Sequence, residues 1–109
     1  MLVDSAVVKD VKNYLSKLCD AGLPISFGVV FGSYANNTAN EYSDIDLIVV
    51  SSEFDKTVSR ENIKKLWRIA ARTDSRIEPI PCGKDQWKND TSNIIIEIAR
   101  TQGQNIAVA

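Results

Sequence analysis

The stretch that decides the fold runs from residue 31 to residue 50 and reads FGSYANNTANEYSDIDLIVV. It ends in a nearly continuous apolar run, Asp44 to Val50, which is typical of a strand in the middle of a sheet. It begins where an earlier apolar run, Ile25 to Phe31, stops at Gly32-Ser33. The sequence therefore predicts two strands, joined by a polar loop of about a dozen residues.

Two carboxylates open the second of these strands. Asp44 and Asp46 are two residues apart, so their side chains point to the same face, about 6–7 Å apart along the strand. If this face were simply solvent-exposed, polar residues would follow at positions 48 and 50, but these are Ile48 and Val50. We therefore expect the carboxylates at the polar mouth of a buried strand, where two negative charges repel unless a cation is present.

Two further features could contribute to the same site. Glycine at position 32 lets the main chain approach a ligand, and Ser33 offers a hydroxyl and a backbone N–H to an anionic oxygen, although such a pair alone is usually only a turn. Glu78 falls on a third expected strand, Arg76 to Ile80, which is closed by prolines. It either joins the aspartates in binding metal or forms an ordinary surface ion pair with Arg76.

The other segments predict helices that cover the sheet. Apolar periodicity and caps indicate helices over 5–20, with Asp4 or Ser5 as N-cap, over about 59–72, and over 92–102, followed by a final strand over 105–109. The order is α-β-β-α-β-α-β, with a possible extra turn near 85–89. The second helix has an apolar face that is expected in the core: Ile63, Leu66, Trp67 and Ala70.

Composition limits the possible functions. The 109 residues, 44% apolar and 25% charged, predict a single soluble domain over 1–109. A net charge of -1 disfavours a strong grip on a polynucleotide. The first residues do not resemble a secretory signal and no apolar run reaches the roughly 18 residues of a membrane span, so we expect a cytoplasmic protein. Cys19 and Cys82 are expected to be reduced packing residues.

Several chemistries are excluded by missing residues. The chain has no histidine, which rules out Ser-His-Asp triads, Cys-His dyads and histidine metal sites. It also contains neither GxxxxGK[ST] nor GxGxxG. Catalysis would have to rest on carboxylates, hydroxyls, lysines or a metal held by oxygen ligands, as magnesium prefers.

The spacing of these residues resembles a known signature. Gly32-Ser33, ten residues and then Asp44-Ile45-Asp46 is similar to the GS-x10-DxD pattern of the nucleotidyltransferase superfamily that includes DNA polymerase beta. The flanking FGSYA and SDIDLIVV look like the minimal nucleotidyltransferases of bacteria and archaea. The segment from Arg76 to Pro81, with Trp87 and the closing EIAR pattern, is similar to one branch of that group. The resemblance covers nearly the whole chain.

This resemblance implies an α/β (α+β) fold, with a mixed sheet flanked by helices, and a Mg²⁺-dependent transferase that uses ATP or another nucleoside triphosphate. If the roles of the family's residues apply to the matching positions here, Gly32 and Ser33 hold the β- and γ-phosphates. Asp44, Asp46 and Glu78 then bind two Mg²⁺ ions and act in catalysis. One departure is Asn36-Asn37, where many relatives have a basic residue. Phosphate-binding charge would then have to come from elsewhere, with Arg76 and Lys84 as candidates.

Two functions remain open at this point. The first is an active enzyme that moves a nucleoside monophosphate, expected to be AMP from ATP, onto a hydroxyl. The expected acceptor is a HEPN-type partner protein, as for some members of the minimal group. The second is a catalytically weak or inactive nucleotide-binding or antitoxin module that acts by binding a partner. A glycosyltransferase that uses DxD for a sugar nucleotide would normally need a far longer chain.

Overall fold

The computed structural model describes residues 4–35, 38–39 and 43–108, and it has the predicted order of elements with a short extra helix. Two short 3-10 helices, η1 and η2, follow the first two strands. The elements in chain order are α1 (Ser5–Asp20), β1 (Ile25–Phe31), η1 (Gly32–Tyr34), β2 (Ile45–Ser51), η2 (Ser52–Phe54), α2 (Arg60–Thr73), β3 (Ile77–Cys82), α3 (Lys84–Asn89), α4 (Ile94–Gln102) and β4 (Gln104–Ala107).

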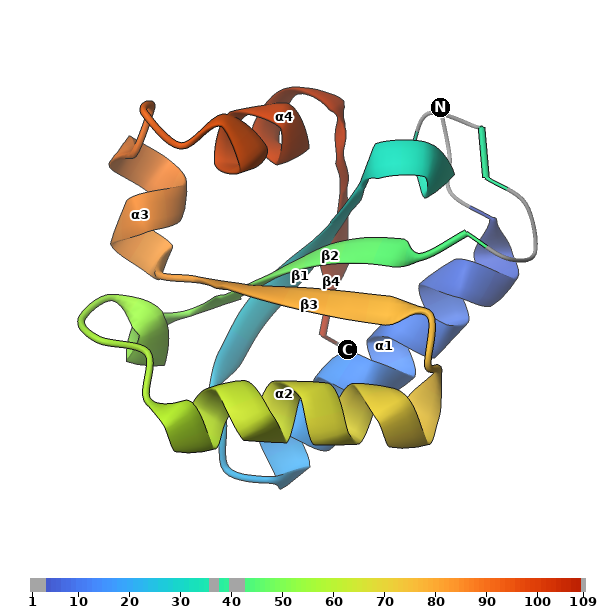
Figure 1. The fold of residues 1–109 in the computed structure, drawn as a ribbon, viewed down its shortest axis with the longest axis horizontal. Coiled ribbons are helices and arrows are strands. Elements are labelled where there is room, and N and C mark those ends of the chain that lie inside the picture. Colours follow the sequence, from blue (N-terminus) through green and yellow to red (C-terminus); the bar gives the residue numbers. More distant parts are fainter. Residues whose placement is uncertain (1–3, 36–37, 40–42, 109) are drawn as a thin grey trace.

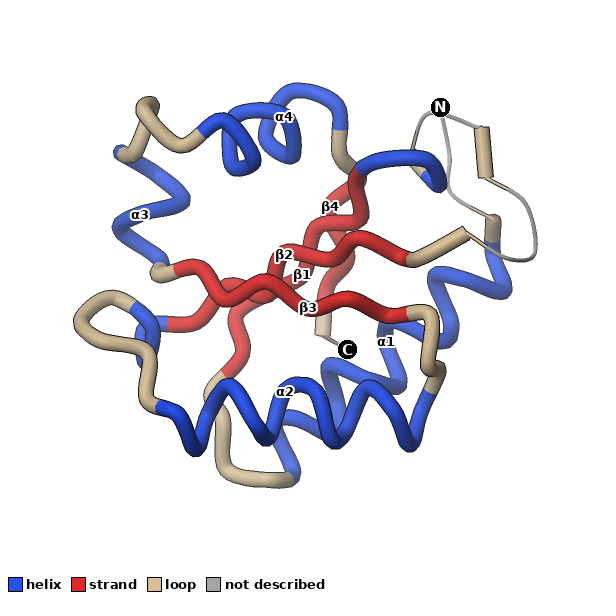
Figure 2. Tube along the Cα trace, in the orientation of Figure 1, coloured by secondary structure: helices blue, strands red, loops and turns tan. Residues whose placement is uncertain are grey.

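The described strands form one mixed sheet with the order β3-β2-β1-β4. β1 runs antiparallel to both β2 and β4, whereas β2 and β3 are parallel. Helices α1 and α2 cover one face of this sheet, and α3 and α4 lie on the other (Figure 1). The same layers are visible in the tube view (Figure 2). The predicted fold class, a mixed sheet flanked by helices, is confirmed.

β2 is buried on both faces, which explains its continuous apolar sequence. Ile45, Leu47 and Val49 belong to the core shared with α1 and α2. The alternate residues Ile48 and Val50 belong to a second apolar cluster on the side of α3 and α4. Because side chains alternate along a strand, Asp46 points to the same side as Ile48 and Val50.

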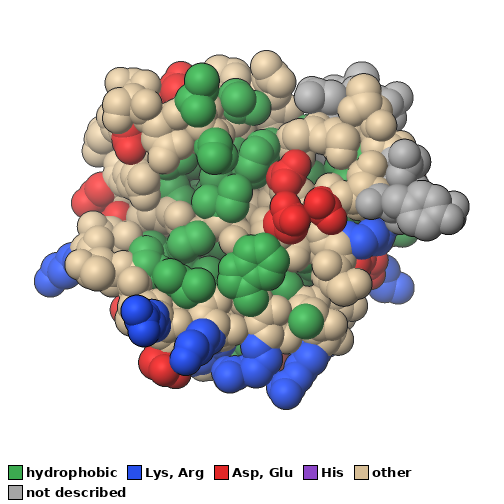
Figure 3. All heavy atoms as spheres, viewed as in Figure 1, with side chains coloured by type: hydrophobic (Ala, Val, Ile, Leu, Met, Phe, Trp, Pro, Cys, Tyr) green, Lys and Arg blue, Asp and Glu red, His purple; other side chains and the backbone are tan. Residues whose placement is uncertain are grey.

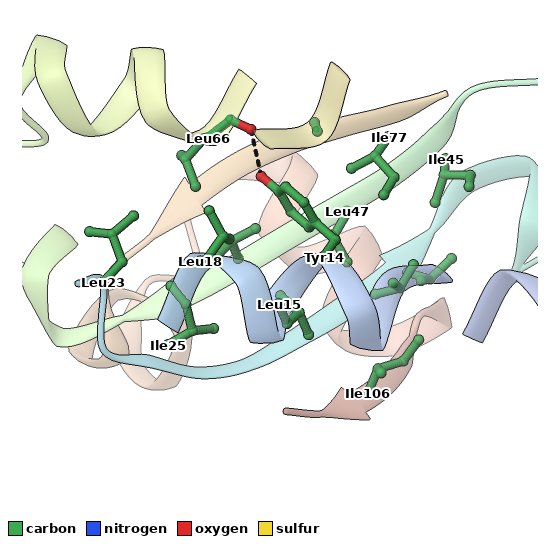
Figure 4. Close-up of a cluster of buried hydrophobic side chains, with 14 of the residues drawn as sticks. Tyr14, Leu15, Leu18, Leu23, Ile25, Ile45, Leu47, Leu66, Ile77 and Ile106 are labelled. Atoms are coloured by element: carbon green, nitrogen blue, oxygen red, sulfur yellow. Dashed lines mark hydrogen bonds between the residues drawn. The ribbon is translucent and has the colours of Figure 1, made fainter. Parts of the chain in front are cut away.

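The larger core lies between α1, α2 and the sheet (Figure 4). Its centre holds Tyr14, Leu15 and Leu18 from α1, each fully buried. The hydroxyl of Tyr14 donates a hydrogen bond of 2.8 Å to the carbonyl oxygen of Leu66 on α2. This bond satisfies a polar atom that burial would otherwise penalise, and it joins the two helices. Burial also raises the pKa of Tyr14, so the hydroxyl stays protonated.

The predicted core face of α2 was wrong in part. Leu66 and Ala70 are buried, but Trp67 is 48% exposed and Ile63 is 39% exposed. The reason is geometric: at about 100° per residue, the stripe of Ile63 and Trp67 lies about 60° around the helix from the stripe of Leu66 and Ala70, at the edge of the buried face. Only one of the two stripes faces α1 and the sheet.

Strand β3 and the helices after it differ slightly from expectation. The strand continues through Pro79 and Pro81 to Cys82 rather than closing at the first proline. β3 is an edge strand, and prolines at alternate positions can both direct their missing N–H toward the open edge. The possible turn near 85–89 is the helix α3, and α4 begins at Ile94, after an N-cap at Asn93.

Two other local predictions, the N-cap of α1 and the reduced cysteines, are confirmed. Asp4, rather than Ser5, is the N-cap of α1, and its carboxylate accepts a hydrogen bond from the Ala6 N–H at 2.7 Å. Both cysteines are free thiols. Burial raises the pKa of Cys82 to about 11, as expected for a packing residue. Among the described residues, no helix combines the length and apolar character needed to cross a membrane.

Candidate active site

The glycine at the end of β1 packs directly against an aspartate of β2. Phe31 is paired with Asp46 in the antiparallel register of the two strands, so the turn that begins at Gly32 starts beside that carboxylate. Gly32 has a φ of 74°, and a Cβ at this position would lie 2.3 Å from Oδ2 of Asp46. Only glycine fits here, because it both tolerates the left-handed backbone and leaves room for the carboxylate.

Glu78 lies on the other side of Asp46. In the parallel register of β2 and β3, Asp46 is paired with Glu78. Asp44 immediately precedes β2 and is exposed, while Asp46 and Glu78 are half-buried. Figure 3 shows acidic side chains gathered on one face of the molecule, next to apolar ones. The sheet therefore brings together the three carboxylates that the sequence singled out.

The three carboxylates influence one another electrostatically. The pKa of Asp46 is raised, first by burial and then by the negative charge of Asp44. The pKa of Glu78 is also raised, first by burial, then by the charge of Asp44 and a hydrogen bond with it, and then by the charge of Asp46. Neighbouring like charges disfavour one another's ionised form, so the site attracts cations.

The carboxylates are neighbours but do not form a closed ligand cage. Within the part of the chain that the structure describes, no set of three acidic or cysteine side chains is drawn together closely enough to hold a metal ion. The donor set nevertheless consists of carboxylate oxygens alone, the hard ligands that Mg²⁺ prefers. The residues present therefore suit magnesium in their chemistry, and an ion would have to draw them inward.

Ser33 is the middle residue of the 3-10 helix η1, which follows β1 directly. Its carbonyl oxygen accepts hydrogen bonds from Thr38, at 3.0 Å from the backbone N–H and 3.4 Å from the hydroxyl. These bonds fasten the turn to the segment after it. The Asn36-Asn37 pair, which stands where many relatives have a basic residue, lies outside the described residues.

Of the two candidate cations for phosphate binding, Arg76 is already paired with carboxylates, and Lys84 lies beyond the far end of β3. Among the described residues, Arg76 pairs with Asp74 at 2.7 Å and with Asp10 at 3.8 Å. The expected alternative of a surface pair between Arg76 and Glu78 is therefore wrong. Lys84 follows the far end of β3, six residues beyond Glu78 and thus roughly 20 Å from it along an extended chain.

Tyr34 and Asp74 also border the site, although sequence reasoning did not single them out. Tyr34 ends η1, and its hydroxyl accepts a hydrogen bond of 2.9 Å from the guanidinium of Arg76. Asp74 follows α2 and holds the same guanidinium from the opposite side. Their positions in the sequence could have indicated them, because Tyr34 comes directly after Gly32-Ser33 and Asp74 is two residues before Arg76.

The family of the chain follows from its sequence as a whole. The nucleotidyltransferase domain matches residues 11–100, which include the turn after β1 and all three carboxylates. The chain belongs to the nucleotidyltransferase domain family. The resemblance seen in the GS-x10-DxD spacing is thereby confirmed, and with it the enzyme class. A search of curated proteins found no relative of this nucleotidyltransferase.

Solved structures share the fold of this nucleotidyltransferase. One is a nucleotidyltransferase-like protein from Sulfolobus solfataricus, with a TM-score of 0.64 and 13% identity over 90% of this chain and 77% of that one. Another is a toxin-antitoxin with AMP-PNP, with a TM-score of 0.59 and 24% identity over 86% and 70% of the two chains. A third is a tri-AMPylated Shewanella oneidensis HEPN toxin in complex with an MNT antitoxin, with a TM-score of 0.55 and 21% identity over 90% and 70%.

Proposed function

We propose that this nucleotidyltransferase uses Mg²⁺ and ATP to transfer AMP onto a hydroxyl group of a partner protein, of the HEPN type, and acts as an antitoxin-like adenylyltransferase. One observation carries the catalytic part: the sheet brings Asp46 against the Gly32 turn on one side and beside Glu78 on the other. A phosphate-binding turn and a set of metal-binding carboxylates are the two parts that a magnesium-dependent transfer of this kind needs.

Each residue has a defined task in this proposal. The backbone at Gly32 and the N–H and hydroxyl of Ser33 bind the β- and γ-phosphates, where glycine permits close approach. Asp44, Asp46 and Glu78 would hold two Mg²⁺ ions. When bound, such ions neutralise the triphosphate and make the acceptor hydroxyl easier to deprotonate. The raised pKa values of Asp46 and Glu78 mean that a bound cation would favour the ionised form of both carboxylates.

In the transfer step, the acceptor oxygen forms a bond to the α-phosphorus of ATP. The bond between that phosphorus and the bridging oxygen breaks, and pyrophosphate leaves with the electron pair. Glu78, on the edge strand and half-buried, accepts the proton of the acceptor hydroxyl. Because β3 is an edge strand, an acceptor on another molecule can approach Glu78 without entering the core.

The partner part rests on three considerations. The near-neutral charge of the chain disfavours a polynucleotide as acceptor. A docked protein supplies its own positioning surface, whereas a free small molecule would forfeit the rate advantage of fixed orientation. Among proteins of the same fold, one solved complex contains a tri-AMPylated HEPN toxin together with an MNT antitoxin. A cytoplasmic location belongs to the same proposal.

The main rival is a module that binds nucleotide or partner but transfers nothing. The specific observation in its favour is that the charge of Arg76 is compensated by Asp74 and that Lys84 lies beyond the far end of β3, so neither adds an uncompensated positive charge beside the Gly32-Ser33 turn. Weak binding of the triphosphate would then leave only the partner-binding role.

Intact mass spectrometry separates the two functions. The protein is incubated with ATP, Mg²⁺ and the candidate partner, which is the protein encoded by the gene next to its own. The masses of both proteins are then measured. An AMP-sized gain on the neighbour that disappears with Asp46→Asn, and persists with the exposed control Asp20→Asn, supports transfer. A stable complex with unchanged masses would overturn transfer and support the binding module.

A further inference from the structure

Arg76 connects the three segments that carry the site. Its Nη1 donates a hydrogen bond to the Tyr34 hydroxyl on η1, at 2.9 Å. Its carbonyl oxygen accepts a hydrogen bond of 2.7 Å from the N–H of Ile45, the first residue of β2. It immediately precedes β3 and stands two residues before Glu78. The phosphate-binding turn, the start of the aspartate strand and the start of the glutamate strand thus meet at one residue.

The guanidinium is itself held rigidly by Asp74. Nε of Arg76 donates to Oδ1 of Asp74 at 3.0 Å, and Nη2 donates to Oδ2 at 2.7 Å. The backbone N–H of Arg76 donates to the same Oδ1 at 3.0 Å. The Asp74 side chain is only 11% exposed, so solvent screens this fork poorly. The pKa of Asp74 is lowered, chiefly by the hydrogen bond from Arg76.

Arg76 contacts both the hydroxyl and the ring of Tyr34. Besides the hydrogen bond, the guanidinium carbon lies 5.8 Å from the centre of the Tyr34 ring, within the range of a cation-π interaction. All three guanidinium nitrogens are therefore engaged by Asp74 and Tyr34. This arrangement uses three of the five N–H donors of the guanidinium and compensates its charge with Asp74, which suits a residue that holds other parts in place.

We propose that Arg76 is a positioning residue that fixes Tyr34, and through it the Gly32-Ser33 turn, relative to Asp46 and Glu78 before nucleotide arrives. This inference rests on the proposed function, because it assigns the turn to phosphate binding. Its physical basis is preorganisation: a turn that is already held in place loses less conformational freedom when the ligand binds. Lysine cannot replace arginine in this role, because it lacks the planar fork.

The test combines nucleotide affinity with thermal stability. Binding of AMP-PNP in Mg²⁺ is measured by calorimetry for the wild type, Tyr34→Phe, Arg76→Lys, the double variant, and Arg68→Lys as an exposed control on α2. Tyr34→Phe keeps the ring and removes the hydroxyl that accepts from Arg76. We expect it to weaken binding roughly five- to tenfold, with a melting temperature close to that of the wild type.

The double variant distinguishes positioning from direct phosphate contact. If Arg76 acts through Tyr34, the two losses overlap and the double variant binds about as weakly as Arg76→Lys alone. If Arg76 touched the phosphate directly, Tyr34→Phe would leave affinity unchanged, and that result would overturn the inference. Equal affinity for Arg76→Lys and the wild type would overturn it as well.

Hydrogen exchange of the free protein keeps this test separate from the proposed function. We expect amides of residues 33–35 to exchange faster in Tyr34→Phe than in the wild type, with exchange in β1 unchanged. If the wild type fails to bind AMP-PNP in Mg²⁺, the proposed function fails. Faster exchange in Tyr34→Phe would still support the positioning of the turn by Arg76. Unchanged exchange at these amides would contradict the positioning role of Arg76, whether or not nucleotide binds.

Discussion

Asp46 on β2 lies beside Glu78 on β3 because the two strands are parallel and their register pairs these residues. The two side chains come from positions 32 residues apart and share the side of the sheet on which α3 and α4 pack. With Asp44 before them, they create a negatively charged region in which burial and mutual repulsion raise the pKa of Asp46 and of Glu78.

The first prediction is that nucleotide binding depends on a divalent ion. A triphosphate would enter a site that already holds three carboxylates, so without metal the charges repel. We expect ATP to bind at least on the order of tenfold more weakly in EDTA than in Mg²⁺ by calorimetry. The penalty of EDTA should shrink in a double variant with Asp44→Asn and Asp46→Asn. Equal affinity in Mg²⁺ and EDTA would contradict the metal assignment.

The second prediction concerns stability and pH in the absence of metal. The pKa of Asp46 is raised in the folded protein, so its charged form is less favourable there than in the unfolded chain. Asp46→Asn should therefore raise the melting temperature at pH 7 in EDTA. The gain should disappear as pH falls through the raised pKa toward the ordinary value of 3.8, because the wild-type carboxyl then becomes neutral too.

Asp74 provides a control of opposite sign for the same experiment. Its pKa is lowered by the hydrogen bond from Arg76, so its charged form stabilises the folded protein above the ordinary value of 3.8. Asp74→Asn should lower the melting temperature at pH 7, and this loss should become smaller as pH falls through the lowered pKa. If both variants shifted the melting temperature in the same direction at pH 7, the electrostatic account of the site would be wrong.

The third prediction separates backbone strain from crowding at the turn. Gly32 and Gly22 both have positive φ values, 74° and 97°. A Cβ at Gly32 meets Asp46 Oδ2, whereas a Cβ at Gly22 meets nothing within 4 Å. Gly22→Ala should cost about 1–2 kcal/mol of unfolding free energy, from the backbone alone. Gly32→Ala should cost more and should also weaken nucleotide binding, as measured by chemical unfolding and calorimetry. Equal costs for the two variants would show that the contact with Asp46 is relaxed easily.

The fourth prediction tests the two apolar stripes of α2. Leu66 is fully buried, so Leu66→Ala should lower the unfolding free energy by about 2–5 kcal/mol. Trp67 is 48% exposed, and Trp67→Ala should cost only about 1 kcal/mol or less. Chemical unfolding of both variants provides the comparison. A larger loss for Trp67→Ala than for Leu66→Ala would mean that the helix is rotated from the orientation described.

Local sequence patterns were sufficient to predict most of the elements. The apolar run after Asp44 indicated a central strand, and β2 is indeed buried on both faces. The second helix was expected over about 59–72, and the Ser59 hydroxyl caps its start by accepting the Asn62 N–H at 3.1 Å. Trp67 was misassigned because a periodic pattern does not say which of two adjacent stripes faces the core. That choice depends on how the helix is rotated against its neighbours.

By itself the sequence determined which residue types could form the site and the family to which the chain belongs. The GS-x10-DxD spacing and the absence of histidine needed no coordinates, because they concern the chemistry and order of side chains along the chain. Only the tertiary structure decided that Asp46 faces Glu78 and that Arg76 turns to Asp74 and Tyr34 instead of Glu78. Strand register and side-chain pairing between distant segments depend on how the whole chain packs, and no local spacing encodes them.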